Sequence, residues 1–409
     1  MTVFLFDDAL REQLYPFTRT RAAADIRCGI LTLRERWEKL LSVGNTGTLT
    51  AGYLQPVYTE TSGPASGLVL LINGRAFGTK MLADQCARLA AGEKISDANG
   101  TVLAACLNTL PEWNNLPAAL EATTTVAAAE TPQFLQRAWD IFGLNGTWIK
   151  ADFALLTAGR ESAKTGEGVT VAGAENVFLE AGAVVRPGTV LNATGGPVYL
   201  GENAEIMEGS LIRGPFALCA GSVVKMGAKI YGDTTIGPGS KVGGEVSNAV
   251  FFANSNKGHD GFVGNCVVGE WCNLGADTNA SNLKNNYDGV KIHDDATGRR
   301  LATGLTFCGL LMGDHSKCGI NTMFNTGTVI GVSCNVYGGE FPPAYIPSFS
   351  WGGAAGLKTY AFDKAIDTAK RMKARRSEAV LPAEEALLRH IFEETAPARE
   401  KAATAPSIL

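Results

Sequence analysis

The sequence lacks the spacings that would make its cysteines and histidines a metal site or a disulfide framework. Its nine cysteines and four histidines include no CxxC pair and no HxxxH arrangement. Because the cysteine count is odd and the spacing irregular, the pattern predicts small buried thiols in a reducing cytoplasm. A structural zinc held by Cys266 and Cys272, or by Cys308 and Cys318, stays open as an alternative.

Long hydrophobic runs and an excess of positive charge are also absent. No stretch approaches the ~20 apolar residues of a membrane span. The first residues, MTVFLFDD, have no basic segment and become acidic, so they predict no signal peptide. Lys and Arg number 36 against 40 Asp and Glu, which argues against a nucleic-acid-binding face. We therefore expect a cytoplasmic protein with small-molecule partners, without nucleic acid or membrane.

Glycine, in contrast, is abundant, and the middle of the chain repeats. Glycine accounts for 48 of 409 residues although 45% of the chain is hydrophobic, which is typical of tight turns rather than disorder. Aliphatic residues recur every six positions between about 165 and 342. The longest unbroken series is Leu218, Val224, Ile230, Ile236 and Val242. A period of six predicts a parallel β-helix of hexapeptide repeats.

Shorter series of the same period flank this one. They comprise Leu179, Val185 and Leu191; Leu200 and Ile206; Phe262, Val268 and Leu274; and Met312, Cys318, Phe324, Ile330 and Val336. Two stretches break the repeat, Asn248–Gly261 and Asn279–Phe307. Since interruptions of a solenoid are loops, and loops on a rigid scaffold often carry function, we expect a site there.

The two flanks of the repeat have different patterns. Residues 1–150 mix strand and helix signals and predict an α/β domain. Its expected strands are Thr2–Phe6 and Leu68–Ile72, and its expected helices are Leu31–Leu41, Met81–Ala91 and Pro132–Phe142. Residues 360–395 predict a helical tail made of Ala361–Arg376 and Ala383–Glu393. The Ala/Pro-rich segment after Glu394 is expected to be frayed.

Polar residues gather in and after the interruptions of the repeat. The segments are NKGHDGFVG at 256–264, NLGADT at 273–278 and NLKNNY at 282–287. They resemble the acetyltransferase half of the GlmU-like bifunctional sugar-1-phosphate nucleotidyltransferase/acetyltransferases, including a divergent Bacteroidetes-type group. The segments GLLMGDH at 309–315 and TGTVIG at 326–331 are similar to the archaeal members. The resemblance implies a left-handed β-helix, a homotrimer, and acetyl-CoA as co-substrate in nucleotide-sugar synthesis for the cell envelope.

The resemblance also implies site residues. His259 matches the general base, Asn273 a sugar-phosphate contact and Asn282 an acetyl-CoA contact. Lys225 falls where the family keeps a phosphate-binding arginine, and Phe262 replaces a substrate-contacting tyrosine. Ser247 replaces a family lysine, whose role Lys257 could fill. The family's NYDG occurs at 286–289, four residues late, so Asn282 and Asn286 compete for one role and Tyr287 is a further acetyl-CoA-binding candidate.

Elementary chemistry supports the same reading of these residues. Acyl transfer to an amine needs a base, and histidine titrates near neutral pH. Lys225, Lys257 and Lys284 could hold a phosphate, and turn amides near Gly319 could face the thioester oxyanion. Two alternatives stay open: the histidine could only satisfy backbone groups of its own loop, and Asn273 could belong to an asparagine stack inside the coil.

The N-terminal segment resembles nucleotidyltransferases more faintly, through LYPFTRTR at 14–21. The glycine-rich phosphate loop of that family is missing. Arg19, Arg21 and Arg27 are candidate nucleotide ligands, and Asp7 or Asp8 could bind Mg²⁺ or merely cap a turn. The predicted activity is N-acetyl transfer to a hexosamine 1-phosphate, paired with nucleotidyl transfer from an NTP. The alternatives are a nucleotidyltransferase with a structural β-helix, and a non-catalytic trimeric sugar-phosphate-binding scaffold.

Overall fold

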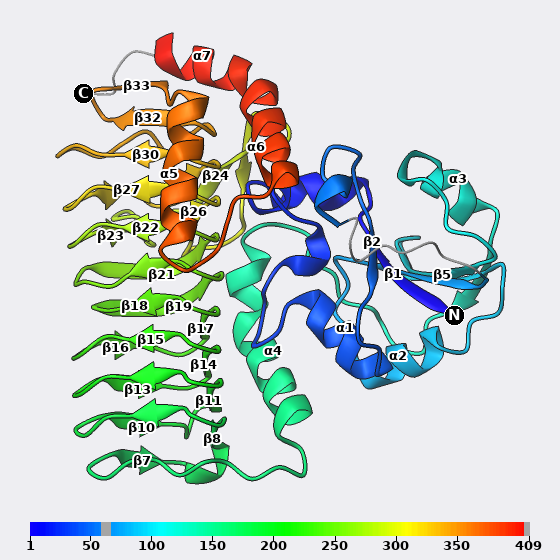
Figure 1. Cartoon of the computed structure of the whole chain (residues 1–409), viewed down its shortest axis with the longest axis horizontal. Coiled ribbons are helices and arrows are strands. Elements are labelled where there is room, and N and C mark those ends of the chain that lie inside the picture. The colour runs from blue at the N-terminus through cyan, green and yellow to red at the C-terminus, as the bar shows by residue number, and fades with distance from the viewer. Residues whose placement is uncertain (59–66, 405–409) are drawn as a thin grey trace.

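The computed structural model describes residues 1–58 and 67–404. An N-terminal α/β domain stands beside a β-helix, and the C-terminal helices run along the β-helix on the side of that domain (Figure 1). The α/β and β-helix predictions are both confirmed, while the left-handed sense of the coil stays a prediction.

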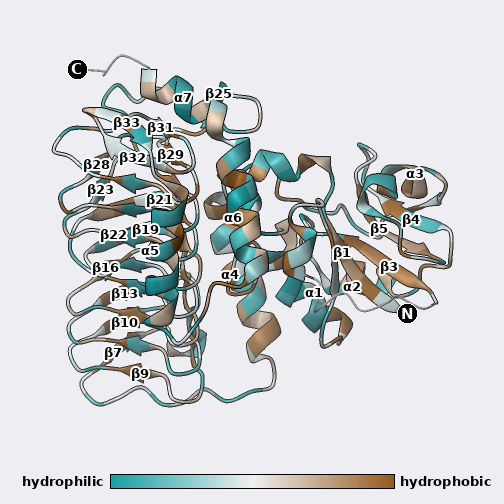
Figure 2. Ribbon diagram, turned by 45° about the horizontal axis from the view of Figure 1, so that its top comes forward, coloured by the Kyte–Doolittle hydropathy of each residue, from teal (hydrophilic) through white to brown (hydrophobic). Residues whose placement is uncertain are grey.

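The N-terminal domain is built on a sheet of order β2-β1-β3-β5-β4-β6. Its strands are β1 (Thr2–Phe6), β2 (Gly47–Leu49), β3 (Val69–Asn73), β4 (Glu93–Ser96), β5 (Val102–Leu107) and β6 (Thr124–Ala127). Its helices are α1 (Leu33–Leu41), α2 (Lys80–Cys86) and α3 (Leu116–Glu121). Figure 2 shows β1 and β3 in the hydrophobic colour, as expected of central strands covered on both sides. Thr32 and Glu35 form a capping box that begins α1.

The helix predicted at Pro132–Phe142 is wrong. Residues Gln133 and Leu135 instead bond as extended chain to Phe77 and Arg75, so tertiary pairing overrides the local helical spacing. The helix of this region is α4 (Asp140–Thr157), which lies against strands of the β-helix. It therefore connects the two bodies of the protein both in sequence and in space.

The β-helix is a three-sided prism of parallel coils. The docked face, which lies against the N-terminal domain, comprises β8 (Val177–Leu179), β11 (Val198–Leu200), β14 (Phe216–Leu218), β17 (Thr234–Ile236), the second halves of β19 (Glu245–Phe251) and β21 (Phe262–Val268), β26 (Leu311–Met312), β29 (Val329–Ile330) and β31 (Tyr345–Ile346). The open face comprises β9 (Val184–Val185), β12 (Glu205–Ile206), β15 (Val223–Val224), β18 (Lys241–Val242), β20 (Asn256–Lys257), β22 (Asn273–Leu274), β27 (Lys317–Cys318), β30 (Asn335–Val336), β32 (Ser350–Gly353) and β33 (Gly356–Thr359).

The third face completes the prism. It comprises β7 (Thr170–Ala172), β10 (Val190–Asn192), β13 (Leu211–Arg213), β16 (Lys229–Ile230), the first halves of β19 and β21, β23 (Asn279–Ala280) and β28 (Met323–Phe324). Long strands β19 and β21 each continue around the edge between the third and docked faces. We call the edge where the open and third faces meet the open corner.

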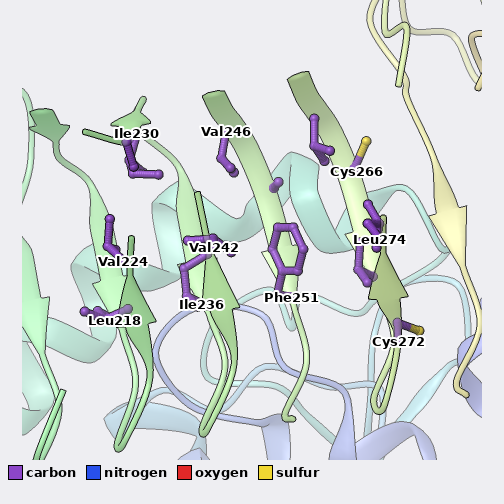
Figure 3. Close-up of a cluster of buried hydrophobic side chains, with 14 of the residues drawn as sticks. Leu218, Val224, Ile230, Ile236, Val242, Val246, Phe251, Cys266, Cys272 and Leu274 are labelled. Carbon is purple, nitrogen blue, oxygen red and sulfur yellow. The ribbon is translucent and has the colours of Figure 1, made fainter. Parts of the chain in front are cut away.

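The predicted aliphatic repeat forms the inside of the coil. Its side chains stack from coil to coil, with Leu218, Ile236 and Phe251 on one wall and Val224, Val242 and Leu274 on another (Figure 3). All nine cysteines are free and buried, as predicted, and several of them lie in this core.

The loop predicted at Asn248–Gly261 is wrong, because this stretch forms a regular coil of the β-helix, with strands on its faces. It carries the end of β19 and all of β20, and its inward side chains are Phe251 and Lys257. The inward positions leading into it are four residues apart from Val242 to Val246 and five from Val246 to Phe251, rather than six, and the next inward residue is a lysine. Both features hide the repeat in the sequence. For the same reason the inward residue of the next strand is Val263, whereas Phe262 points outward.

The second interruption is an insertion at the edge between the third and docked faces. It contains an antiparallel hairpin of β24 (Lys291–Asp294) and β25 (Arg299–Ala302). Helices α5 (Phe362–Ala374) and α6 (Pro382–Glu394) follow the coil, as predicted. The segment expected to fray forms α7 (Ala396–Thr404), which packs on β33 and thereby closes the end of the coil. No helix in the described residues is both long and apolar enough to cross a bilayer.

Candidate functional site

His259 lies in the turn that joins β20 to β21 at the open corner. Its side chain is exposed and makes no hydrogen bond within the described residues. This contradicts the alternative that the imidazole ties down its own loop. The ring is therefore free to accept a proton from a ligand in this arrangement.

Lys257 lies inside the coil and does not face a ligand. Only 1% of its surface is exposed, and its register partner on the neighbouring strand is Val242. The ammonium group donates to three backbone carbonyls, those of Gly243 at 3.0 Å, His259 at 2.7 Å and Asp260 at 3.2 Å. Burial lowers the pKa of Lys257 to about 8. The predicted phosphate contact by Lys257 is wrong, because its three donors are occupied.

Other predicted residues lie on the coils around His259. Lys225 is at the open corner two coils away, roughly 10 Å at the usual strand spacing. Asn273 is exposed on the adjacent coil and lies beside Asn256, so the alternative of an internal asparagine stack is wrong. Gly319 follows β27 at the same corner, two coils beyond His259.

Three of the residues predicted to bind acetyl-CoA, and the predicted phosphate contact Lys284, lie at the other edge of the third face, in or beside the insertion. Asn282 donates to the Asn265 side chain at 2.8 Å, and Lys284 donates to the Gly289 carbonyl. Asn286 bonds Asp288, and Tyr287 is 72% exposed. Asn282 is thus held on the coil, whereas Asn286 and Tyr287 project from the insertion.

Phe262 lies between these two groups. A side-chain Cβ placed on Gly264 would meet the Phe262 ring at 2.5 Å and the Asn282 amide at 2.8 Å. The ring therefore covers Gly264 and reaches towards Asn282 on the third face. The structure thus arranges His259, Phe262 and Asn282 across one face, from the open corner to the insertion.

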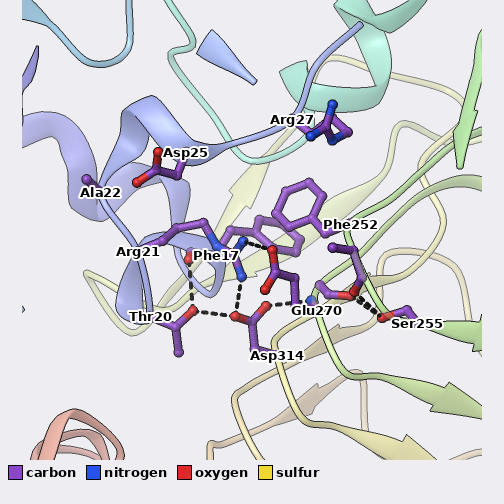
Figure 4. A network of polar contacts seen from close by, with 12 residues as sticks. Phe17, Thr20, Arg21, Ala22, Asp25, Arg27, Phe252, Ser255, Glu270 and Asp314 are labelled. Atoms are coloured by element: carbon purple, nitrogen blue, oxygen red, sulfur yellow. Dashed lines mark hydrogen bonds and ion pairs between the residues drawn. The ribbon is translucent and has the colours of Figure 1, made fainter. Parts of the chain in front are cut away.

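The arginines predicted to bind a nucleotide are instead paired with carboxylates. Arg21 contacts Glu270 at 2.9 Å and also bonds Asp314, which accepts a further bond from Thr20 (Figure 4). Both carboxylates lie at turns of the β-helix where the docked face meets the open face. Burial raises the pKa of Glu270 against the opposing effect of Arg21.

The two other arginines are also occupied. Arg19 pairs with Asp295 of the insertion at 2.6 Å and with Glu394 of α6 at 2.8 Å. Arg27 pairs with Glu35 at 3.2 Å and bonds the Ile30 carbonyl. In this arrangement Arg19 and Arg21 attach the N-terminal segment to the insertion, α6 and the coil, and Arg27 pairs within that segment. The three side chains therefore face protein groups, and their role as nucleotide ligands stays a prediction.

Asp7 and Asp8 do not fit Mg²⁺ in this arrangement. Asp7 is buried, pairs with Arg11 at 3.0 Å, and accepts from Thr50 and the Ala23 amide. Asp8 pairs with Arg75 at 2.6 Å and also accepts from Asn73 and the Leu10 amide. Every carboxylate oxygen already has a donor, whereas a magnesium ligand needs free lone pairs. No group of three or more His, Cys, Asp or Glu suitable for a metal occurs in the described residues. The described residues therefore supply no further ligands for a zinc ion at Cys266 and Cys272 or at Cys308 and Cys318.

Sequence reasoning missed the carboxylates that pair with the arginines. Asp314 lies within the segment GLLMGDH, Asp295 within the second interruption of the repeat, and Glu270 between the segments at 256–264 and 273–278. No local spacing links them to residues 19–27, which lie 249 to 293 positions away for the Arg21 pairs. Only the docking of the two bodies brings these charges together.

A cavity of about 680 Å³ lies at the end of the coil near Arg19. It is bounded by the insertion hairpin, the loop before β31 and the junction of α6 and α7. His293 and Tyr345 stack at 3.5 Å beside it. None of the residues predicted from the sequence as sugar-phosphate or acetyl-CoA ligands lines this cavity.

Comparison with known proteins supports the two-part reading. Residues 3–161 match the family model for sugar nucleotidyl transferases. The chain is 32% identical over 146 residues to a bifunctional sugar-1-phosphate nucleotidylyltransferase/acetyltransferase of Sulfurisphaera tokodaii, covering 35% of this chain and 36% of that protein. It is 32% identical over 167 residues to the bifunctional protein GlmU of Nocardia farcinica, covering 34% and 31%. The predicted resemblance to GlmU-like proteins is confirmed.

These similarities cover only part of each protein. The chain matches only about a third of the length of those two relatives. Among solved structures, a UDP-N-acetylglucosamine acyltransferase of Francisella novicida aligns with 58% of this chain and 89% of its own, at 14% identity and a TM-score of 0.24. That TM-score is too low to support an argument about this protein.

Proposed function

We propose that the protein is an acetyl-CoA-dependent N-acetyltransferase that acts on a hexosamine 1-phosphate. The observation that carries the proposal is the exposed imidazole of His259 at a turn of the β-helix, which has no hydrogen-bond partner in the part of the chain that the structure describes. Asn273 lies on the adjacent coil and Lys225 two coils away. The similarity to bifunctional sugar-1-phosphate nucleotidylyltransferase/acetyltransferases supports the same class of chemistry.

In the proposed reaction the amine nitrogen of the sugar attacks the thioester carbonyl. A C–N bond forms, the C–S bond breaks, and coenzyme A leaves as a thiolate that takes a proton. His259 accepts the proton lost by the nitrogen. Lys225 offers an ammonium group for the sugar phosphate. Asn273 offers an exposed amide to the sugar, and the third face with Phe262 and Asn282 leads from His259 to the insertion.

The proposed assembly is a homotrimer. Within one chain the docked face is covered by the N-terminal domain, and α5 follows the edge where the docked and open faces meet, where Arg376 bonds Gly239 and Asn254. The open corner instead exposes apolar side chains two coils to either side of His259, with Met226 at 68% and Ile320 at 70% exposure. Sedimentation should show a trimer, and a monomer at working concentration would contradict this.

Release of free thiol tests the activity directly. The protein is mixed with acetyl-CoA and a panel of amino-sugar phosphates, with the matching neutral amino sugars as controls. We expect thiol release with at least one hexosamine 1-phosphate and much less with its dephosphorylated form. Thiol release that is independent of every acceptor, or none at all, would contradict the proposal.

A second proposed activity is nucleotidyl transfer to a sugar 1-phosphate, favoured by the family match of residues 3–161. The occupied arginines and aspartates oppose it, as does the missing glycine loop. We therefore expect pyrophosphate release from any NTP and sugar phosphate, with added Mg²⁺, to be slower than acetyl transfer. Equal or faster nucleotidyl transfer would show that the N-terminal segment rearranges when it binds substrate.

A further inference from the structure

The interior of the β-helix contains a lysine where its neighbours place aliphatic side chains. Along the inner wall of the open face, the inward residues of successive strands are Val224, Val242, Lys257, Leu274 and Cys318. A buried ammonium group is costly unless its donors are all satisfied. A lysine at this position therefore needs a specific reason.

The hydrogen bonds of Lys257 converge on the turn that carries His259. Two of the three acceptors are the carbonyls of His259 and Asp260, and the third is the carbonyl of Gly243 on the preceding coil. The Asp260 carbonyl also accepts from the Asp277 amide of the following coil at 3.1 Å. The ammonium group thus connects the His259 turn to the preceding coil through Gly243. The backbone hydrogen bond from Asp277 connects the same turn to the following coil.

The turn needs such a connection because its own backbone is unusual. Gly261 has φ of +107°, and a Cβ at this position would meet the Thr278 carbonyl at 2.2 Å. The carbonyls of His259 and Asp260 point towards the interior, where water is excluded and a buried acceptor needs a donor. The Lys257 side chain supplies that donor from inside, which leaves the outer surface of the turn open to a ligand.

We propose that Lys257 is the positioning residue of His259: from inside the coil, its ammonium group sets the turn so that the imidazole stands exposed at the open corner. This role rests on His259 being the base in the proposed acetyl transfer. Lys257 does not touch substrate, because it is enclosed by the coil. It acts only through the backbone of the turn.

The test replaces the donors while keeping the side-chain stem. Lys257→Met retains an unbranched apolar chain inside the coil but leaves the three carbonyls without their donor. We expect kcat to fall about 10- to 100-fold, with KM for both substrates within about threefold, because a displaced base harms the chemical step more than binding. Combined with His259→Ala, Lys257→Met should cause little further loss, since both changes remove one function.

Two matched controls separate positioning from general loss of stability or charge. Val242→Ala removes packing from the same inner wall on the adjacent coil but leaves the carbonyls bonded. Lys241→Met removes a positive charge from the outer side of the open face. Both should keep kcat within about threefold. A Lys257→Met enzyme with kcat within threefold of the parent, or a Val242→Ala enzyme with an equal loss, would overturn the positioning role.

A measurement without substrate keeps this inference separate from the proposed function. Hydrogen exchange of the amides at 258–264, followed by mass spectrometry, should speed up at least tenfold in Lys257→Met and remain unchanged in Lys241→Met. Unchanged exchange in Lys257→Met would overturn the role even if the enzyme is active. If the parent protein transfers no acetyl group, the proposed function fails, and the exchange result still decides whether Lys257 orders the turn. Should Lys257→Met not fold, Lys257→Gln, which retains a shorter donor, is measured in the same way and should show an intermediate effect; exchange equal to the parent would overturn the role.

Discussion

The docked and open faces of the β-helix follow the same inward pattern but differ in the residue that precedes each inward position. On the docked face these outward residues are mostly apolar: Phe178, Tyr199, Ala217, Val250, Val267, Leu311 and Val329. On the open face they are mostly polar: Glu205, Lys241, Asn256, Asn273, Lys317 and Asn335.

This difference assigns the docked face to the stability of the fold and the open face with its corner to the candidate site. The outward residues of the docked face pack against Phe17, Ala23 and Ile26 of the N-terminal segment. The open face and its corner leave His259 and Asn273 exposed. We therefore expect substitutions on the docked face to change the free energy of unfolding, and substitutions at the open corner to change turnover. The following experiments test that division.

The largest effect is expected for His259→Ala. Because the side chain is exposed and leaves the core intact, turnover should fall roughly 10²- to 10⁴-fold while the melting temperature and KM change little. The loss should be smaller at high pH, where solvent can take the proton. Measured kcat within about threefold of the parent, or a large drop in melting temperature, would contradict the role of base.

The next largest effect is expected when a charge is introduced on the docked face, beneath the N-terminal domain. Leu311→Asp puts a carboxylate into the apolar contact with that domain and should lower the free energy of unfolding by about 3–5 kcal/mol. The kcat of the remaining folded protein should be unchanged. Lys241→Asp on the open face is the control and should alter stability by less than about 0.5 kcal/mol in denaturant titrations. An equal decrease in the free energy of unfolding for the two variants would contradict the proposed difference between the docked and open faces.

The buried charges at the edge of the docked face should matter slightly less. Arg21→Gln leaves Asp314 and Glu270 without their cationic partner and should destabilise the protein by about 3 kcal/mol. Arg186→Gln, which removes a pair with Glu205 on the outer surface, should cost about 0–1 kcal/mol. Increased nucleotide binding or nucleotidyl transfer in Arg21→Gln would contradict the attachment role.

The smallest effect concerns pH. Burial lowers the pKa of Lys257 to about 8, against the opposing effect of Asp260, Asp277 and Cys318, whereas the ordinary lysine value is 10.5. Between these values the unfolded chain binds more protons than the folded one, so this group makes the folded state more stable as pH rises from about 8 towards 10.5. Relative to Lys257→Met, the parent should gain stability over that interval. A constant difference between the two would contradict the lowered pKa.

Much of the fold could be predicted from the sequence because the hexapeptide repeat is a local property. Leu218, Val224 and Ile230 point inward because each coil repeats the same strand and turn. The prediction failed around Lys257, because the spacing shortens just before it, at Val246 and Phe251, and because this inward residue is charged. It also failed for the helix at 132–142, where pairing with residues 75–77 keeps the chain extended.

The candidate site was predictable in its residue types but not in their roles. The motif at 256–264 identified His259, yet it assigned Lys257 to a ligand although that side chain points into the coil. The outward residues of each strand, apolar on one face and polar on another, were a readable signal for the docked face. A repeat defined only by every sixth position does not include these residues.

The sequence by itself determined which residues line the coil, since strand alternation and the six-residue turn act within a few positions of the chain. Tertiary structure alone decided that Arg19 and Arg21 pair with carboxylates of α6, the insertion and the coil. It also decided which face the N-terminal domain covers and which corner leaves His259 open. These outcomes depend on contacts between segments hundreds of residues apart, where charge and apolar surface are matched only after both bodies have folded.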